Sequence, residues 1–270
     1  RQRRYHVHGA GILSLIHPSA IVDPGAELEA GVEVGPFSIV GPRVRIGRGT
    51  RIGPHVVLRG PTDIGQDNRI FQFASVGEDP QDKKYGGEET RLTLGDRNVI
   101  REGTTIHRGT IQDAGVTCIG SDNLFMADTH VAHDCRIGDH VIMANAASLG
   151  GHVRVEDWAI LGGFTLVHQF CHIGANSFCA MGSVITRDVP TYLTVGGHPA
   201  IPRGVNSEGL KRRGFSDEAI TLIRRAYRLL YTSSLKLSDA LAAIRELSGP
   251  CPELAHLADF IANSTRSIVR

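Results

Sequence analysis

Aliphatic residues recur at every sixth position along more than half of the chain. Counting from Ile16 in steps of six to Val76 gives eleven consecutive branched aliphatic residues, and the residue two places earlier is mostly small. The same period resumes within residues 94–106 and 119–185. A period of six fits neither a helix nor a simple alternating strand. It is typical of a parallel β-helix, in which each hexapeptide forms a short strand and a turn and stacked coils bury the aliphatic side chains.

The period is interrupted twice, at residues 77–91 and at residues 107–117. With three hexapeptides to a coil, the repeat predicts a triangular prism of roughly nine coils over residues 14–190. The two interruptions should then form loops that project from the prism. Because long irregular insertions in a regular scaffold are usually functional, we expect these loops to contribute to a site.

After Pro190 the spacing of apolar residues becomes helical, and we expect residues 191–270 to form a small α-helical domain that serves packing or oligomer contact. Serines followed by acidic residues mark two helix starts. The expected helices lie within residues 207–231 with an N-cap at Ser216, within residues 239–247 after a cap at Ser238, and within residues 252–264.

Composition narrows the class of protein. The formal charge of +1 gives no reason to expect nucleic acid as a partner, and no apolar run approaches the roughly 18 residues of a membrane span. The five cysteines include no C-x-x-C pair, which favours a reducing cytoplasm over a disulfide framework or a zinc site. Residues 1–13 lack an adequate apolar core for a signal peptide, and we interpret them as a tag remnant or a short native extension.

The repeat also predicts which polar side chains meet. Residues 18 apart in an uninterrupted run should stack on neighbouring coils, about 4.8 Å apart. A histidine then lies one coil from a glycine, with an aspartate beside it. The two predicted columns are His133, Gly151 and Gln169, and next to them Asp134, His152 and Phe170.

These residue types suit acyl transfer to a hydroxyl group. Histidine supplies a base of near-neutral pKa for a weakly acidic alcohol, and a glycine N–H can stabilise the tetrahedral intermediate. A carboxylate beside the histidine would hold its tautomer and orientation. Because no Ser or Cys is clearly placed as a nucleophile beside His133, we favour direct transfer over a covalent intermediate.

Several segments together resemble the UDP-N-acetylglucosamine 3-O-acyltransferases, which catalyse the first step of lipid A synthesis. The segments are QFASVGEDPQDKKYGGEETR, IREGTTIHRGT, HVAHDC, GGHV, VHQFC and GLKRRGFS, and the resemblance covers about residues 15–270. Single hexapeptides are shared by many transferases, whereas HVAHDC together with IHRGT and GLKRRGF is highly specific. The resemblance implies that the β-helix is left-handed.

The resemblance further implies a cytoplasmic bacterial homotrimer, without cofactor, whose active sites lie between adjacent prisms. It implies transfer of a 3-hydroxyacyl group from acyl carrier protein to the glucosamine 3-hydroxyl of UDP-N-acetylglucosamine. By matching motifs, His133 would be the general base, Asp134 its orienting partner and Gly151 the donor to the oxyanion. The implied substrate contacts are His130, His152, His168 and Gln169 in the sugar-nucleotide pocket, Asp82 and Lys84 in the first loop, and Asn206, Glu208, Arg212 and Arg213 toward the nucleotide or the carrier protein.

Met181 matches the position of the family's acyl-chain ruler. A glycine there leaves a longer groove, whereas methionine should cap it, so the resemblance implies a donor nearer ten carbons than fourteen. The alternative is that Met181 only fills a gap in a turn.

Three other functions are compatible with such a prism. The sibling N-acyltransferase of the same pathway is disfavoured by the GLKRRGF tail and by Lys84. A metal-dependent hydratase of the γ-carbonic anhydrase type needs histidines about two coils apart, and no such triad forms 36 residues on from His130, His133, His140 or His152, so we expect no metal. A catalytically silent assembly module has no use for the arrangement around His133.

Overall fold

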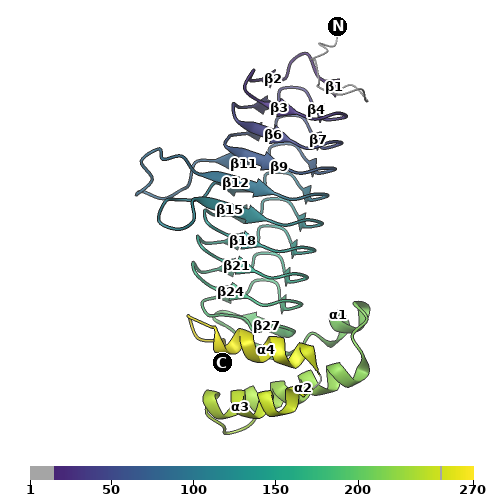
Figure 1. Cartoon of the computed structure of the whole chain (residues 1–270), viewed down its shortest axis with the longest axis vertical. Helices are drawn as coiled ribbons and strands as arrows, with labels where there is room; N and C mark the ends of the chain where they lie inside the picture. Colours follow the sequence, from purple (N-terminus) through teal and green to yellow (C-terminus); the bar gives the residue numbers. More distant parts are fainter. Residues whose placement is uncertain (1–14, 250) are drawn as a thin grey trace.

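The computed structural model describes residues 15–249 and 251–270, so the segment at residues 1–13 lies outside the described residues. Short strands stack into three sheets of eleven, nine and eight strands that form a prism, with the helices together at one end (Figure 1). The predicted left-handed parallel β-helix followed by a small helical region is confirmed.

Strands follow one another around the prism, so every third strand up to β26 belongs to the same sheet. The first sheet contains β1 (Leu15–Ile16), β4 (Glu33–Val34), β7 (Arg51–Ile52), β10 (Arg69–Ile70), β13 (Val99–Ile100), β16 (Leu124–Phe125), β19 (Ile142–Met143), β22 (Ile160–Leu161), β25 (Phe178–Cys179), β27 (Leu193–Gly197) and β28 (Ala200–Val205). The second contains β2 (Ile21–Val22), β5 (Ile39–Val40), β8 (Val57–Leu58), β11 (Ser75–Glu78), β14 (Thr105–His107), β17 (His130–Val131), β20 (Ser148–Leu149), β23 (Leu166–Val167) and β26 (Val184–Ile185). The third contains β3 (Glu27–Leu28), β6 (Val44–Ile46), β9 (Thr62–Ile64), β12 (Arg91–Leu94), β15 (Val116–Ile119), β18 (Arg136–Ile137), β21 (Arg154–Val155) and β24 (His172–Ile173).

The interior of the prism is built from the aliphatic residues of the repeat. Val131 on β17 pairs in register with Leu149 on β20, and both are fully buried. Burial of each such side chain contributes about 1.5–3 kcal/mol. Because side chains alternate along a strand, the preceding residues His130 and Ser148 face outward. The repeat therefore fixes which face of the second sheet carries polar groups.

The position two residues before each aliphatic accepts asparagine as well as small side chains. The N–H of Asn98 donates to Oδ1 of Asn68 over 2.8 Å, and the N–H of Asn123 donates to Oδ1 of Asn98 over 2.9 Å. All three side chains are buried at a corner of the prism. A buried amide costs little when it is hydrogen-bonded, so this ladder ties successive coils together.

Two loops leave the prism where the period breaks, between β11 and β12 and between β14 and β15, and they project on the same side (Figure 1). Arg108 joins them. Its buried guanidinium donates to the carbonyl of Gly77 over 2.6 Å and also bonds the carboxylate of Asp79. The loops are thus held against each other at their base.

The region after residue 190 begins with two strands and not with the predicted helices. β27 pairs with β25 in parallel and β28 pairs with β27 in antiparallel, so the first sheet continues to Val205. The hexapeptide period ends earlier because an antiparallel hairpin does not turn the corners of the prism. Buried Leu193 and Val195 close the end of the interior instead.

Four helices follow: α1 (Ser207–Arg212), α2 (Asp217–Tyr231), α3 (Leu237–Ser248) and α4 (Pro252–Ala262). Ser216 caps α2 as predicted, since its side chain accepts from the N–H of Ala219. The predicted cap at Ser238 is wrong, because α3 begins two residues earlier, after Lys236, and its apolar Leu237 packs on the helical core. Among the described residues no helix is long and apolar enough to cross a membrane.

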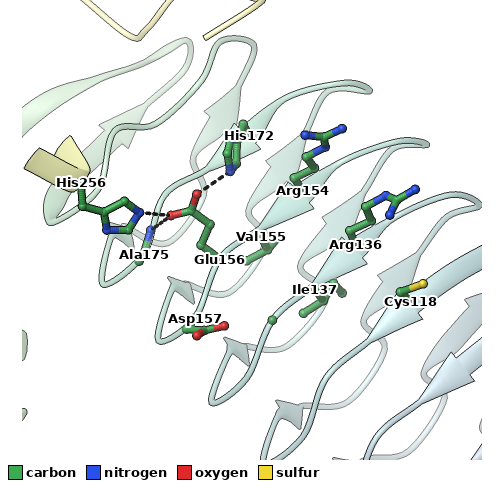
Figure 2. A pocket seen from close by; sticks show the side chains of 11 residues that line it. Cys118, Arg136, Ile137, Arg154, Val155, Glu156, Asp157, His172, Ala175 and His256 are labelled. Atoms are coloured by element: carbon green, nitrogen blue, oxygen red, sulfur yellow. Dashed lines mark hydrogen bonds and ion pairs between the residues drawn. The ribbon is translucent and has the colours of Figure 1, made fainter. Parts of the chain in front are cut away.

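Glu156 fastens α4 to the prism, as Figure 2 shows. Its carboxylate lies 2.9 Å from Nε2 of His172 on β24 and 3.4 Å from Nε2 of His256 on α4, and it accepts from the N–H of Ala175 over 2.8 Å. Burial raises the pKa of Glu156, but these contacts outweigh it and lower the pKa to about 2. The helical region is therefore joined to the last coils by a charged contact as well as by apolar packing.

Candidate active site

A cleft of about 430 Å³ lies on the outer face of the second sheet and brings most of the predicted catalytic residues together. A larger cleft of about 550 Å³ on the third sheet contains Glu156 and its histidine partners, but no base next to a glycine. We therefore take the smaller cleft, which both His133 and Gly151 line, as the candidate active site. Its lining residues are Gln81, His107, His130, Ala132, His133, Ser148, Leu149, Gly150, Gly151, Leu166, Val167 and Gln169.

His133 and Asp134 form a hydrogen-bonded pair at the turn after β17. Nδ1 of His133 lies 2.8 Å from Oδ2 of Asp134, and the two side chains are 14% and 1% exposed. Burial raises the pKa of Asp134, but hydrogen bonds from His133 and Thr110 outweigh it, so its pKa lies below the usual value. An ionised Asp134 accepts the Nδ1 proton and leaves Nε2 of His133 as the free nitrogen base.

The second loop supplies the groups that hold Asp134. The N–H of Thr110 donates to Oδ1 over 2.8 Å, and its hydroxyl donates to Oδ2 over 2.6 Å. The N–H of Asp134 in turn donates to the hydroxyl of Thr117 over 2.8 Å. The carboxylate thus cannot rotate without breaking several bonds, and the orientation of His133 follows from it.

The coil that follows packs against the ring of His133 through a glycine. A Cβ placed on Gly151 would lie 2.5 Å from Cε1 of His133, so a larger residue would displace the ring. The N–H of His152 donates to the carbonyl of His133 over 3.0 Å, and the His152 ring stacks on Phe170 at 4.4 Å. The two columns predicted from the 18-residue spacing are confirmed.

His130 and His107 stand beside the base on the floor of the cleft. Burial lowers the pKa of His130 to about 4, and His107 and His133 act in the same direction. Nδ1 of His130 lies 2.7 Å from the hydroxyl of Thr105. A neutral imidazole at this position can bind a polar substrate group without placing a second positive charge beside His133.

The other predicted substrate residues differ in whether they line this cleft. Gln169 lines it, and His168 is exposed next to Gln169, whose carbonyl lies 3.1 Å from Nδ1 of His168. In the first loop, Asp82 accepts from the N–H of Lys84 over 2.9 Å, while the neighbouring Gln81 reaches the cleft.

The predicted residues of the helical region do not line this cleft in a single chain. Asn206 caps α1 by accepting from the N–H of Gly209, and its amide donates to the carbonyl of Asn176 over 2.9 Å. Glu208 and Arg212 on α1 are exposed. Arg213 lies with its guanidinium 5.2 Å from the ring centroid of Trp158.

Sequence reasoning assigned no role to four residues that shape the site. Gln81 and His107 line the cleft, Thr110 fixes Asp134, and the carboxylate of Asp113 lies 3.2 Å from Nδ1 of His152. All four lie within or at the edge of the two breaks in the repeat. The two breaks in the repeat indicated that their loops contribute to a site, but an irregular loop gives no register from which to place a side chain.

Comparison with known proteins agrees with this site. The family description "Udp N-acetylglucosamine O-acyltransferase; Domain 2" matches residues 188–269, and "Bacterial transferase hexapeptide (six repeats)" matches residues 25–60. Proteins named acyl-[acyl-carrier-protein]–UDP-N-acetylglucosamine O-acyltransferase are 56% identical in Halorhodospira halophila and 59% identical in Pseudomonas syringae pv. syringae. Each match covers 96% of this chain and 100% of the relative. The chain belongs to the UDP-N-acetylglucosamine O-acyltransferase family.

Solved structures of this family superimpose closely on the chain. UDP-N-acetylglucosamine acyltransferase of Francisella novicida aligns with a TM-score of 0.93 at 40% identity, covering 95% of this chain and 94% of the other. UDP-N-acetylglucosamine O-acyltransferase of Moraxella catarrhalis aligns with a TM-score of 0.92 at 44% identity, covering 94% and 99%. As a member of the family the chain is an acyltransferase, which confirms the predicted enzyme class and sets the three alternative functions aside.

Proposed function

We propose that the chain transfers a 3-hydroxyacyl group from acyl carrier protein to the glucosamine 3-hydroxyl of UDP-N-acetylglucosamine, the first step of lipid A synthesis. The observation that carries the proposal is the His133–Asp134 pair packed against Gly151 in an open cleft. The names of the relatives specify the donor, the acceptor and transfer to oxygen. Direct attack requires a base beside the acceptor, and His133 is that base.

The proton moves in a closed sequence. Nε2 of His133 takes the proton of the 3-hydroxyl as its oxygen attacks the thioester carbon, and the resulting imidazolium is stabilised by Asp134. When the tetrahedral intermediate collapses, the bond from carbon to sulfur breaks. The imidazolium returns the proton to the departing thiolate of the carrier protein, so the base is regenerated without a covalent enzyme intermediate.

The negative oxygen of the intermediate requires a fixed donor beside the base. We assign this role to the N–H of Gly151, because this residue packs directly against the His133 ring. A backbone donor is preorganised here, since the coil is hydrogen-bonded on both sides: the carbonyl of Gly151 accepts from Phe170 over 3.0 Å and His152 donates to His133.

Substrate recognition is assigned to groups around the base. We propose that His130, His152, His168 and Gln169 hold the sugar nucleotide and that Asp82 and Lys84 reach it from the first loop. Among the described residues none beyond Gln169 lines the cleft within one chain, and we propose that Asn206, Glu208, Arg212 and Arg213 reach the nucleotide from a neighbouring copy. This supports the proposed homotrimer with sites between prisms.

The direct test is an acyl-transfer assay with UDP-N-acetylglucosamine and 3-hydroxyacyl carrier proteins of several chain lengths. We expect His133→Ala to lower the rate by about 10²-fold or more, because general-base catalysis contributes that much. The matched control is His55→Asn, which changes an exposed turn histidine outside the cleft and should retain the wild-type rate. A near-full rate in His133→Ala would exclude this mechanism, and no transfer with any donor would exclude the proposed reaction.

A further inference from the structure

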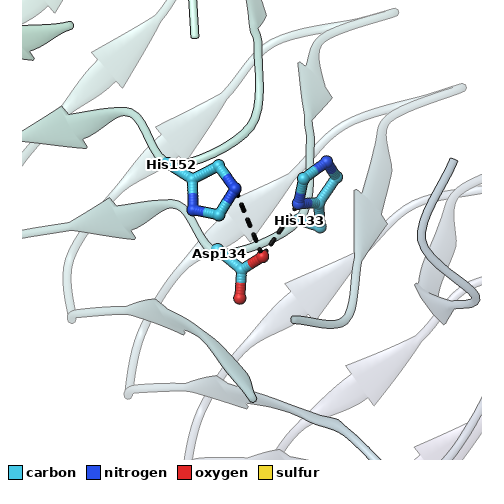
Figure 3. A group of neighbouring side chains, drawn as sticks. All are labelled: His133, Asp134 and His152. Atoms are coloured by element: carbon cyan, nitrogen blue, oxygen red, sulfur yellow. Dashed lines mark hydrogen bonds and ion pairs between the residues drawn. The ribbon is translucent and has the colours of Figure 1, made fainter. Parts of the chain in front are cut away.

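Three metal-binding atoms converge beside the catalytic base. His133, Asp134 and His152 each offer a ligand atom within 4.8 Å of the other two, and Figure 3 shows both imidazoles turned toward the carboxylate. Two histidines and a carboxylate form a typical zinc ligand set. The expectation of no metal considered histidines two coils apart, whereas His133 and His152 lie on adjacent coils.

The hydrogen bonding of His152 leaves a place for a cation. Its Nδ1 lies 3.2 Å from Oδ2 of Asp113, so a neutral ring that donates there presents the lone pair of Nε2 to Asp134. Nε2 is 3.8 Å from Oδ2 of Asp134, too long for a hydrogen bond. Two acceptors therefore face each other across a gap that a positive ion would fill.

The separations and the supporting groups fit zinc. Bonds of about 2.0–2.2 Å in a tetrahedron place ligand atoms roughly 3.3–3.6 Å apart. The observed 2.8 Å between His133 and Asp134 and 3.8 Å between His152 and Asp134 bracket that value. The outer contacts also match, since metal-binding histidines commonly donate their other N–H to a carboxylate, as His152 does to Asp113.

We propose that His133, Asp134 and His152 form an inhibitory site for a divalent ion of the zinc class. Binding of the ion to Nδ1 of His133 would shift the single proton of the neutral ring from Nδ1 to Nε2, so the ring could no longer accept a proton from the substrate. Mg²⁺ should not compete, because it prefers oxygen ligands in octahedral geometry. The inhibition rests on the proposed role of His133, whereas the binding does not.

The experiment is a calorimetric titration of the metal-free protein with Zn²⁺, run for wild type, His152→Gln and His256→Gln. The control His256 is a more exposed histidine that also lies beside a carboxylate, on α4. We expect His152→Gln to bind the tightest zinc ion at least about tenfold more weakly and His256→Gln to match wild type. Weaker sites elsewhere are common to all three proteins, so the difference isolates this one.

Two further measurements keep the result interpretable. In wild type, Zn²⁺ should shift the ring nitrogen NMR signals of His133 and His152 but not those of His256. This measurement does not depend on the folding of a variant. Acyl transfer by wild type should fall with Zn²⁺ and not with Mg²⁺. Equal zinc binding by wild type and His152→Gln, or zinc binding without inhibition, overturns the proposal. Absence of transfer in the metal-free protein would instead count against the proposed function.

Discussion

Asp134 connects the irregular part of the chain to the chemistry. Its carboxylate receives the N–H and hydroxyl of Thr110 from a loop, and Nδ1 of His133 from its own turn. Because the carboxylate is almost fully buried, each of these bonds is formed in a medium of low dielectric constant and is stronger than on the surface. The loop thereby fixes the carboxylate that orients His133.

Replacing Thr110 by valine tests this indirect control. The variant keeps the shape and the backbone N–H but removes the 2.6 Å bond to Asp134, so we expect kcat to fall about tenfold with little change in KM. Steady-state kinetics with varied acceptor separates the two constants.

The control is Thr104→Val. Thr104 is equally buried and its hydroxyl contacts Thr129 at 3.1 Å, away from the cleft. Both variants should lose about 1 kcal/mol of unfolding free energy, but Thr104→Val should keep its rate. Equal loss of activity in both would show that Thr110 acts only through stability.

The side chain of Met181 is expected to limit the length of the acyl chain. It lies in the turn that follows β25 and is 78% exposed in the single chain, next to Gly182, whose N–H donates to the carbonyl of Gly163. If a neighbouring copy forms the other wall of an acyl groove, this side chain would close it. We expect Met181→Gly to shift preference from donors of about ten carbons toward longer ones, measured by competition between carrier proteins. The control is Met181→Leu, which keeps a side chain of similar bulk and should keep the preference for the shorter donor.

Sequence reasoning reached the residues that obey the repeat and missed those that do not. His133, Gly151 and Gln169 could be brought together because equal spacing in sequence becomes stacking in space. Thr110 and Asp113 could not, since their loop has no period. Their positions depend on tertiary contacts such as the bond to Asp134.

Among the contacts between elements, the one that joins α4 to the prism is sensitive to acid. Glu156 bonds His172 and His256, and the ring of His172 packs 4.5 Å from that of Phe260. The pKa of Glu156 is lowered, so its contribution to stability is present above its ordinary value of about 4.5 and is lost as the pH falls toward about 2. The pKa of His256 is raised, chiefly by its hydrogen bond with Glu156, so its contribution is present below about 6.5 and declines at higher pH.

Replacement of Glu156 by glutamine should therefore remove stability in a pH-dependent way. We expect a loss of about 2 kcal/mol near pH 6, because one pKa unit corresponds to about 1.4 kcal/mol and the carboxylate is still 28% exposed. The difference from wild type should shrink as the pH approaches 3. Urea unfolding at several pH values measures both.

Glu33→Gln serves as the matched control. Glu33 pairs with Arg51 at 3.4 Å on the exposed face of the first sheet, where such pairs contribute little. A pH-independent loss in Glu156→Gln, or the same loss in Glu33→Gln, would exclude the acid-sensitive contact.

Periodicity predicted the repetitive elements well but not the elements that end them. The strands of the prism follow from the six-residue spacing, and Ser216 marks α2 correctly. The hairpin of β27 and β28 has no such period. It continues the first sheet because β27 pairs with β25, and the local sequence does not predict that contact. Ser238 illustrates the same limit, since burial of Leu237 decides where α3 begins.

In the molecule as a whole, the cleft of one chain lacks those nucleotide-binding groups that are proposed to come from the helical region. α1 carries exposed Glu208 and Arg212, and Nη1 of Arg213 is buried without a hydrogen-bond partner among the described residues. None of these residues lines the cleft on the second sheet. A neighbouring copy that brings its α1 to the cleft would complete the site.

Mixing two inactive variants tests this arrangement. We expect His133→Ala chains and Arg213→Ala chains to regain activity when unfolded and refolded together in equal amounts, because about one third of the sites in mixed trimers, or about one quarter of all sites, would combine an intact base with an intact α1. Acyl transfer is measured after light scattering has established the trimer mass. No recovery, with mixed trimers present, would place both groups in the same chain, and each variant refolded alone is the control.

The hairpin of β27 and β28 has a consequence for how copies of this protein can associate. An open β-helix ends in unpaired backbone groups, which invite a further chain to add strands and extend a fibre. Here the last coil pairs with β27, and β28 then turns back in antiparallel, with the helices beyond it. Head-to-tail growth along the prism axis is blocked at this end. Association side by side is the direction that leads to closed and finite assemblies.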